Sequence, residues 1–346
     1  MSLQLPGSRE PIVSISSMFS IVKCSSTTLF ICCALLLLLS NIREGGGTAQ
    51  GKGSIDCKVD SCMRSSYHSR GKNVIIFGGS SGMGKACAKV IVANGGNVLL
   101  VSRSAHKLAK AREEILSNCL PSKDKSVVAN NDKEDSIICQ TSILDVTNEK
   151  AVVEFVNQLK GQKEKWDGLV YTIAGRAPHG SIVGLNTMDT RGIMESKLWG
   201  AYHCIKHILS NQLLTEGGAI VLTAGILNRR PGMNCLPLAM VNGALEGMTR
   251  ALALELGPTL RVNCLSPGFC DTERFDHMDP YKKEAMMKNT AESLPLRRIG
   301  TPQDMGEALY FLLTAPFCTG VILDVDGGHG IRQYANPIGD PMRSKL

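Results

Sequence analysis

The chain has 346 residues, of which 43% are hydrophobic, and its mean hydropathy is +0.02. These values exclude a membrane protein with several spans and leave room for one large domain or two small ones. The net charge of +7 comes without a block of Lys and Arg interleaved with aromatic residues, so no nucleic-acid partner is expected.

The N-terminal part of the chain differs in pattern from the rest. Residues 29–39 are an unbroken apolar run that follows Lys23. The run is short for a membrane span of about 20 residues but suits the core of a signal peptide. We therefore interpret residues 1–49 as a hydrophobic leader, which gives a membrane contact only if it is retained. The Gly-, Ser- and charge-rich residues 50–70 are interpreted as a linker.

From residue 71 onward, apolar runs of strand character alternate with segments of helical character. Strands are expected at 72–77, 97–101, 137–144, 168–173, 219–223, 260–265 and 320–325. Helices are expected to begin near residues 84, 105 and 148 and to cover 188–211, 236–256, 281–293 and 302–314. The alternation predicts an α/β fold, a doubly wound parallel sheet of the Rossmann type, as a single domain over residues 71–330. The polar segment 117–136 is interpreted as a surface loop, and residues 331–346 as a C-terminal tail.

A glycine-rich turn follows the first expected strand and opens a helix. In such a turn the first glycine permits a tight bend, the second lets the backbone approach a pyrophosphate, and the third lets the helix pack close to the strand. The phosphates then lie at the N-terminus of a helix. We predict that this turn binds a dinucleotide through Gly78, Ser80, Ser81, Gly82, Met83 and Gly84.

The next expected strand ends in Ser102-Arg103, and Arg103 lies 19 residues past Gly84. A dinucleotide fold places its ribose-reading residue about 20 residues beyond the turn, where an acid holds a 2′-hydroxyl and an Arg suits a 2′-phosphate. No acid stands here, so we predict an NADP(H) site read by Arg103.

Several further motifs follow in an order that resembles the short-chain dehydrogenase/reductase family over nearly all of residues 72–330. They are Leu144-Asp145-Val146-Thr147, Ala174-Gly175, Arg261 to Gly268 with Thr272, and Asp326-Gly327-Gly328. The resemblance implies that Asp145 meets the adenine, that Ala174-Gly175 lines the cofactor cleft, and that Pro267, Gly268 and Thr272 hold the nicotinamide. It also implies a homo-oligomer, a dimer or tetramer, assembled through residues 188–211 and 236–256.

The chain departs from this family where the family performs catalysis. The family uses Asn, Ser and a Tyr-x-x-x-Lys pair, in which the Lys ammonium lowers the pKa of the Tyr phenol. Counting back from residues 244–247, the Tyr position falls on Leu238, the Lys position on Asn242, the Ser position near Gly225 and the Asn position on Lys197. Leucine cannot donate a proton, so the usual mechanism is not available.

Cations stand where this machinery is missing, and they leave two hypotheses open. In the first, the chain is a reductase of a carbonyl or enoyl substrate that carries an anionic group. Lys197 or an ordered water then supplies the proton, and Arg229 or Arg230 anchors the anion. Relatives that reduce the activated double bonds of acyl-CoA esters also dispense with the Tyr, although they retain the Lys. In the second, the chain is an inactive module that binds NADP(H) or serves as an oligomer partner.

The ends of the chain carry conflicting addresses. The last residues, Ser344-Lys345-Leu346, form the peroxisomal signal, whereas the apolar leader predicts the secretory pathway or the endoplasmic reticulum. The 13 cysteines show no Cys-x-x-Cys and no His/Cys metal spacing, so no metal site and mostly reduced thiols are expected. We favour the peroxisome. Mass spectrometry of the native N-terminus discriminates, because an end near Gln50 would establish leader cleavage.

Overall fold

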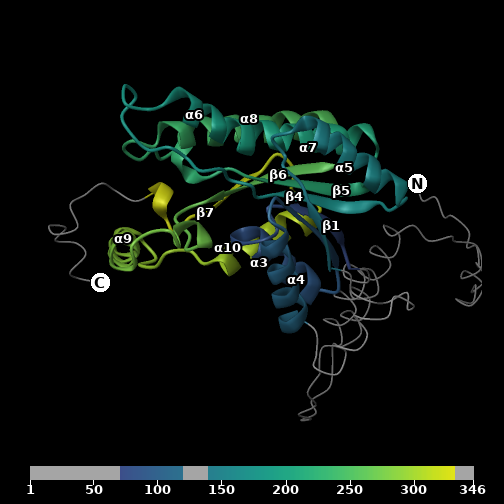
Figure 1. The fold of residues 1–346 in the computed structure, drawn as a ribbon, viewed down its shortest axis with the longest axis horizontal. Coiled ribbons are helices and arrows are strands. Elements are labelled where there is room, and N and C mark those ends of the chain that lie inside the picture. The colour runs from purple at the N-terminus through teal and green to yellow at the C-terminus, as the bar shows by residue number, and fades with distance from the viewer. Residues whose placement is uncertain (1–70, 120–138, 332–346) are drawn as a thin grey trace, which may run out of the picture. The chain divides into compact units, whose positions relative to one another are not determined.

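A computed structural model describes residues 71–119 and 139–331 of the chain. The leader, the linker, most of the polar loop and the C-terminal tail with Ser344-Lys345-Leu346 therefore lie outside the described residues. The described part contains one sheet of seven parallel strands in the order β3-β2-β1-β4-β5-β6-β7 (Figure 1). The strands are β1 Asn73–Phe77, β2 Asn97–Ser102, β3 Cys139–Ile143, β4 Trp166–Tyr171, β5 Leu214–Thr223, β6 Arg261–Pro267 and β7 Ile322–Val325. The predicted doubly wound α/β fold is confirmed.

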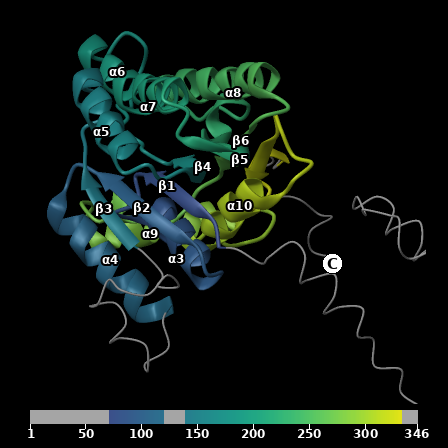
Figure 2. The ribbon, with the colours of Figure 1, turned by 90° about the vertical axis from the view of Figure 1, so that its right-hand side faces the viewer.

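Helices cover both faces of this sheet (Figures 1 and 2). One face is covered by α3 Gly82–Ala93, α4 Ala105–Cys119 and α10 Pro302–Thr314. The other is covered by α5 Glu149–Gly161, α6 Thr187–Met194, α7 Gly200–Ser210 and α8 Leu236–Leu256. A further helix, α9 Pro280–Ser293, lies apart from both groups. No described helix combines the length and the hydropathy that a membrane crossing needs.

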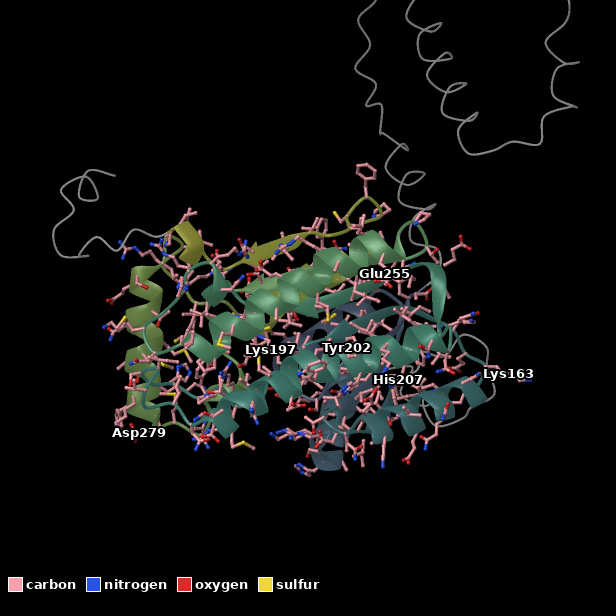
Figure 3. All side chains as sticks on the ribbon, turned by 90° about the horizontal axis from the view of Figure 1, so that it is seen from above. Lys163, Lys197, Tyr202, His207, Glu255 and Asp279 are labelled. Carbon is pink, nitrogen blue, oxygen red and sulfur yellow. The ribbon has the colours of Figure 1, made fainter. Side chains whose placement is uncertain are left out.

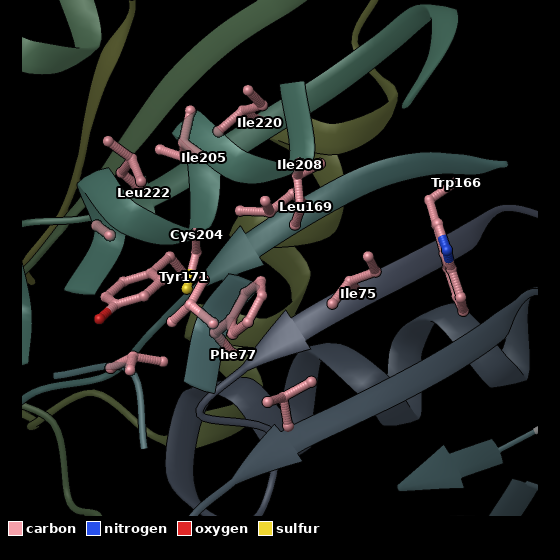
Figure 4. Close-up of a cluster of buried hydrophobic side chains, with 14 of the residues drawn as sticks. Ile75, Phe77, Trp166, Leu169, Tyr171, Cys204, Ile205, Ile208, Ile220 and Leu222 are labelled. Carbon is pink, nitrogen blue, oxygen red and sulfur yellow. The ribbon is translucent and has the colours of Figure 1, made fainter. Parts of the chain in front are cut away.

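The strands at the centre of the sheet are buried on both faces, which explains why they appear in the sequence as continuous apolar runs. Along β1, Ile75 and Phe77 pack toward α5 and α7, whereas Val74 and Ile76 pack toward α3. Figure 4 shows the first of these cores, in which Phe77 and Tyr171 lie with ring centroids 5.9 Å apart. These two cores fix the carboxyl ends of β1 and β4 next to each other.

The segment expected to be one helix over residues 188–211 is interrupted. Between α6 and α7 the backbone forms a π-helix, η3 Glu195–Trp199. The buried phenol of Tyr171 donates a hydrogen bond to the Ser196 carbonyl at 2.5 Å, and a Cβ at position 200 would lie 2.5 Å from that phenol oxygen. A glycine at 200 therefore lets the strand side chain reach the widened turn. Such single π-turns are frequent at functional sites.

Candidate active site

The glycine-rich turn lies where the strand order reverses, between β1 and β4, which is where open α/β sheets bind ligands. Gly78 has φ +90° and its N–H donates to the Val101 carbonyl of β2 at 2.8 Å. A Cβ at position 84 would lie 2.4 Å from the Gly78 carbonyl oxygen and 2.6 Å from Thr172 Oγ1. Only glycine fits that position. The turn thus has the close backbone packing on which the dinucleotide prediction depends.

The first turn of α3 already holds an anion from the same chain. Gly82 N–H donates to Glu273 Oε2 at 2.8 Å, and Lys85 Nζ lies 3.0 Å from Glu273 Oε1. The helix N-cap, Ser81, makes no side-chain cap bond, and Ser80 and Met83 are half-buried beside the turn. A helix N-terminus that binds a carboxylate has the donors that a phosphate needs. The residues of this turn therefore fit a dinucleotide pyrophosphate.

The other predicted cofactor residues lie on loops that leave the carboxyl ends of the strands. Arg103 follows β2, is exposed, and makes no hydrogen bond or ion pair with another residue in the described ranges. Asp145 follows β3 and accepts hydrogen bonds from the N–H and the hydroxyl of Thr147 at 3.1 and 2.8 Å. Both side chains are exposed and therefore open to a ligand.

Ala174 and Gly175 follow β4, whereas Pro267 is the last residue of β6 and Gly268 follows it. A Cβ at position 175 would lie 2.2 Å from Ser196 Oγ in the π-helix, and one at 268 would lie 2.6 Å from Asp326 Cα. Both glycines therefore bring two loops together at the cleft. Thr272 completes the set, because its Cγ2 lies 3.4 Å from where a Cβ on Gly82 would stand.

Lys197 is the most unusual side chain at this edge of the sheet. It comes from the π-helix, is 5% exposed, and donates hydrogen bonds to the Ala224 carbonyl and to Asn242 Oδ1, both at 2.7 Å. Among the described residues no carboxylate pairs with it. Burial lowers the pKa of Lys197 from 10.5 to about 8, and the positive charge of Arg274 acts in the same direction. The ammonium has a third N–H, so it can serve as a proton donor near neutral pH.

The positions at which the sequence predicts the family's Ser, Tyr and Lys hold side chains that fit one another. Gly225 has φ +152°, a conformation open only to glycine, and a Cβ there would lie 2.9 Å from Asn242 Nδ2. A serine is thereby excluded while Asn242 keeps its place. Leu238 is 7% exposed and packs with Ala177, Ile193 and Val241 in a small apolar cluster. Leu238, at the predicted Tyr position, is thus part of a small core.

The two arginines predicted to anchor a substrate do not stand together as free cations. Arg229 Nε lies 3.3 Å from the buried Glu246 carboxylate, and its Nη2 donates to Ser266 Oγ at 2.9 Å and to Asp324. Because two carboxylates compensate its charge, the structure favours a role for Arg229 in joining α8 to β6 and β7. Arg230 is half-buried, and its backbone N–H donates a hydrogen bond to the Ile226 carbonyl at 2.8 Å.

Three residues at the site were missed from the sequence. The count from residues 244–247 predicts Asn242 at the Lys position and Lys197 at the Asn position, but it does not predict the hydrogen bond between the two side chains. Glu273 follows Thr272 directly, and a carboxylate beside a residue predicted to hold the cofactor is a signal that the sequence offers. Arg274 lies in the 3-10 helix η5 Glu273–Phe275, close enough for its charge to affect Lys197.

A parallel sheet with a glycine-rich turn at its switch point and a buried lysine ammonium near the end of β5 is the arrangement expected of a dinucleotide-dependent oxidoreductase of the Rossmann class. The sequence matches the family described as enoyl-(acyl carrier protein) reductase over residues 78–330. The short-chain dehydrogenase/reductase ATR9 of Stachybotrys chlorohalonatus is 30% identical over 265 residues, which cover 75% of this chain and 97% of that protein. The chain therefore belongs to the short-chain dehydrogenase/reductase family of NAD(P)-dependent oxidoreductases.

Solved structures agree with this assignment. The crystal structure of a small-chain dehydrogenase in complex with NADPH has a TM-score of 0.58 at 27% identity and covers 75% of this chain and 98% of its own. The MalC reductase/Diels-Alderase of Malbranchea aurantiaca has a TM-score of 0.67 at 22% identity and covers 78% of this chain and 100% of its own. The second likeness shows the fold alone.

Proposed function

We propose that this protein is an NADP(H)-dependent reductase of a carbonyl or enoyl substrate that carries an anionic group, and that Lys197 supplies the proton. When bound, the nicotinamide cofactor supplies the hydride. Lys197 Nζ holds a proton at the end of β5, fixed by the Ala224 carbonyl and Asn242 Oδ1, and releases it to the oxygen or carbon that becomes basic as the hydride adds. The observation that carries the proposal is this buried ammonium without a carboxylate partner.

An anionic substrate is supported by the charges near Lys197. Arg274 is exposed and makes no ion pair within the described part of the chain, and its positive charge repels that of Lys197. A carboxylate or phosphate near both groups would relieve this repulsion, since two neighbouring cations attract an anion. We therefore propose Arg274, in place of Arg229, as the group that attracts the anionic part of the substrate.

The preference for NADP(H) rests on Arg103. The guanidinium is exposed beside the turn and has no competing partner among the described residues. A relative of known structure binds NADPH, which supports the same cofactor here. Arg103→Ala is expected to weaken NADPH binding by about 10-fold or more, because a charge-assisted hydrogen bond contributes about 1.5–3 kcal/mol. NADH binding should stay the same.

Cofactor fluorescence titration measures both affinities, and Lys110→Ala in the second turn of α4 controls for the loss of one positive charge. If NADPH and NADH bind the wild-type protein equally, or if Arg103→Ala loses both cofactors alike, the residue does not read the 2′-phosphate.

The alternative is an inactive family member that binds NADP(H) without turnover, and the burial of Leu238 at the Tyr position favours it. The test is the purified protein with NADPH and a panel of ketones, enones and enoyl-CoA esters, followed by NADPH absorbance. Oxidation of NADPH that depends on one substrate class supports the reductase. Binding of NADPH without oxidation by any member of the panel supports the inactive module.

We also propose a homo-oligomer. Trp199, Tyr202 and Met240 on η3, α7 and α8 are 46%, 44% and 50% exposed, and Figure 3 shows Tyr202 on this helical layer. Trp199 and Tyr202 pack edge to face with centroids 5.7 Å apart, which forms an apolar surface of the kind that subunits bury. Sedimentation is expected to give a dimer or tetramer. A monomer at micromolar concentration would contradict the proposal.

A further inference from the structure

The N-terminus of α3 is held by a carboxylate from a distant part of the chain. Glu273 is 191 residues beyond Gly82 in the sequence, yet its Oε2 accepts the Gly82 N–H at 2.8 Å. Its other oxygen lies 3.0 Å from Lys85 Nζ, one helical turn further on. The carboxylate thus uses both a backbone N–H and a side-chain cation at the one helix end that the glycine-rich turn prepares for a pyrophosphate.

The Gly82 N–H cannot donate a full hydrogen bond to a carboxylate and to a phosphate at once. Two anions at the same helix end would also repel each other. We propose that Glu273 is an internal competitor of the cofactor: its carboxylate holds the N-terminus of α3 until the pyrophosphate displaces it. This inference rests on the cofactor site of the proposed function and is independent of Lys197 and of turnover.

The contacts around Glu273 allow it to leave at small cost. Its side chain is 41% exposed, so the carboxylate can regain water when it moves. Lys85 does not lose its only partner, because its Nζ also lies 2.9 Å from Glu114 Oε2. The segment itself stays anchored by Phe275, whose ring stacks on Phe269 with centroids 5.1 Å apart. A change of the Glu273 side-chain rotamer is enough to free Gly82 N–H.

Glu273→Gln tests the inference, because the neutral amide keeps the shape of the side chain but competes less strongly with a phosphate for the Gly82 N–H. The variant is expected to bind NADPH about 3- to 10-fold more tightly in calorimetric titration. NADH should gain by the same factor, since the pyrophosphate is common to both cofactors. Glu114→Gln is the matched control, because it also removes a carboxylate from Lys85 but none from Gly82, and it should change either affinity less than twofold.

A second readout needs no cofactor. Hydrogen exchange of the Gly82 amide in the free protein should be faster in Glu273→Gln than in wild type and unchanged in Glu114→Gln. If Glu273→Gln does not fold, Glu273→Asp provides the same test, because the shorter side chain keeps the charge but does not reach Gly82.

The other outcomes overturn the inference. Unchanged or weaker binding by Glu273→Gln would show that Glu273 is neutral or helps the cofactor. If Glu114→Gln raised the cofactor affinity as much as Glu273→Gln, the effect would come from the loss of any nearby negative charge and not from the contact with Gly82. If neither wild type nor variant binds NADPH or NADH, both the cofactor assignment and this inference fail, whereas a protein that binds NADPH with no difference between variants fails this inference alone.

Discussion

Lys197→Met is expected to reduce turnover by about 10²- to 10⁴-fold, the range that a positioned general acid contributes, while NADPH binds as in wild type. The reason is the position of the side chain. Its ammonium is fixed at 2.7 Å from both Ala224 O and Asn242 Oδ1, whereas the contacts at Gly82, where the pyrophosphate is expected, are made by Glu273 and do not involve Lys197. Single-turnover kinetics and NADPH titration separate the two effects. Lys206→Met on α7 is the control, because Lys206 is half-exposed and pairs with Glu149 at 3.0 Å.

The pH dependence of turnover gives an independent check on the same residue. Burial lowers the pKa of Lys197 to about 8, so the ammonium carries its proton below that pH and loses it above. The reductive rate constant is therefore expected to be level below pH 8 and to fall about tenfold per pH unit above it. A rate that stays level up to pH 10 in wild type, or an unchanged kcat in Lys197→Met, would remove Lys197 from the mechanism.

Much of the fold could be predicted because local signals and tertiary packing agree. The helix α8 has the predicted bounds, 236–256, and a Pro in its first turn. The helix α10, predicted at 302–314, also begins with Pro and has a capping box between Thr301 and Asp304. Residues 74–77 of β1 form an apolar run because both faces of the strand are buried. In each case a few neighbouring residues determine the element.

The site could be predicted only in part, because its contacts join residues far apart in the chain. The π-helix depends on the bond from Tyr171 to Ser196, 25 residues away, and no local propensity encodes it. Lys197 and Asn242 are 45 residues apart, and Glu273 and Gly82 are 191 apart. The sequence predicts Arg229 only as a possible anchor for an anionic substrate. Its partners Glu246 and Asp324 come from a helix and a strand that the sequence does not place beside it.

Asn242→Lys is expected to lower the free energy of unfolding by about 3–5 kcal/mol, because it buries a second ammonium beside that of Lys197 without a carboxylate. Asn242 is 2% exposed, and its Oδ1 accepts from Lys197 Nζ at 2.7 Å, so a lysine there brings two like charges together. Urea unfolding at a fixed protein concentration measures the change. Gly243→Lys, at the adjacent exposed position of α8, adds the same charge at the surface and should not destabilise the protein.

The double variant, Lys197→Asn with Asn242→Lys, is expected to recover most of that loss, since it again holds one ammonium and one amide, now exchanged between α8 and the π-helix. The decisive quantity is the coupling energy between the two substitutions. Changes in the free energy of unfolding add when the mutated residues are far apart, and they do not add when the residues are in contact. If Asn242→Lys lowers the free energy of unfolding by the same amount in the Lys197→Asn background as in wild type, the two side chains do not interact. A large favourable coupling would instead establish that the side chains at positions 197 and 242 interact and that this buried site accepts one ammonium but not two.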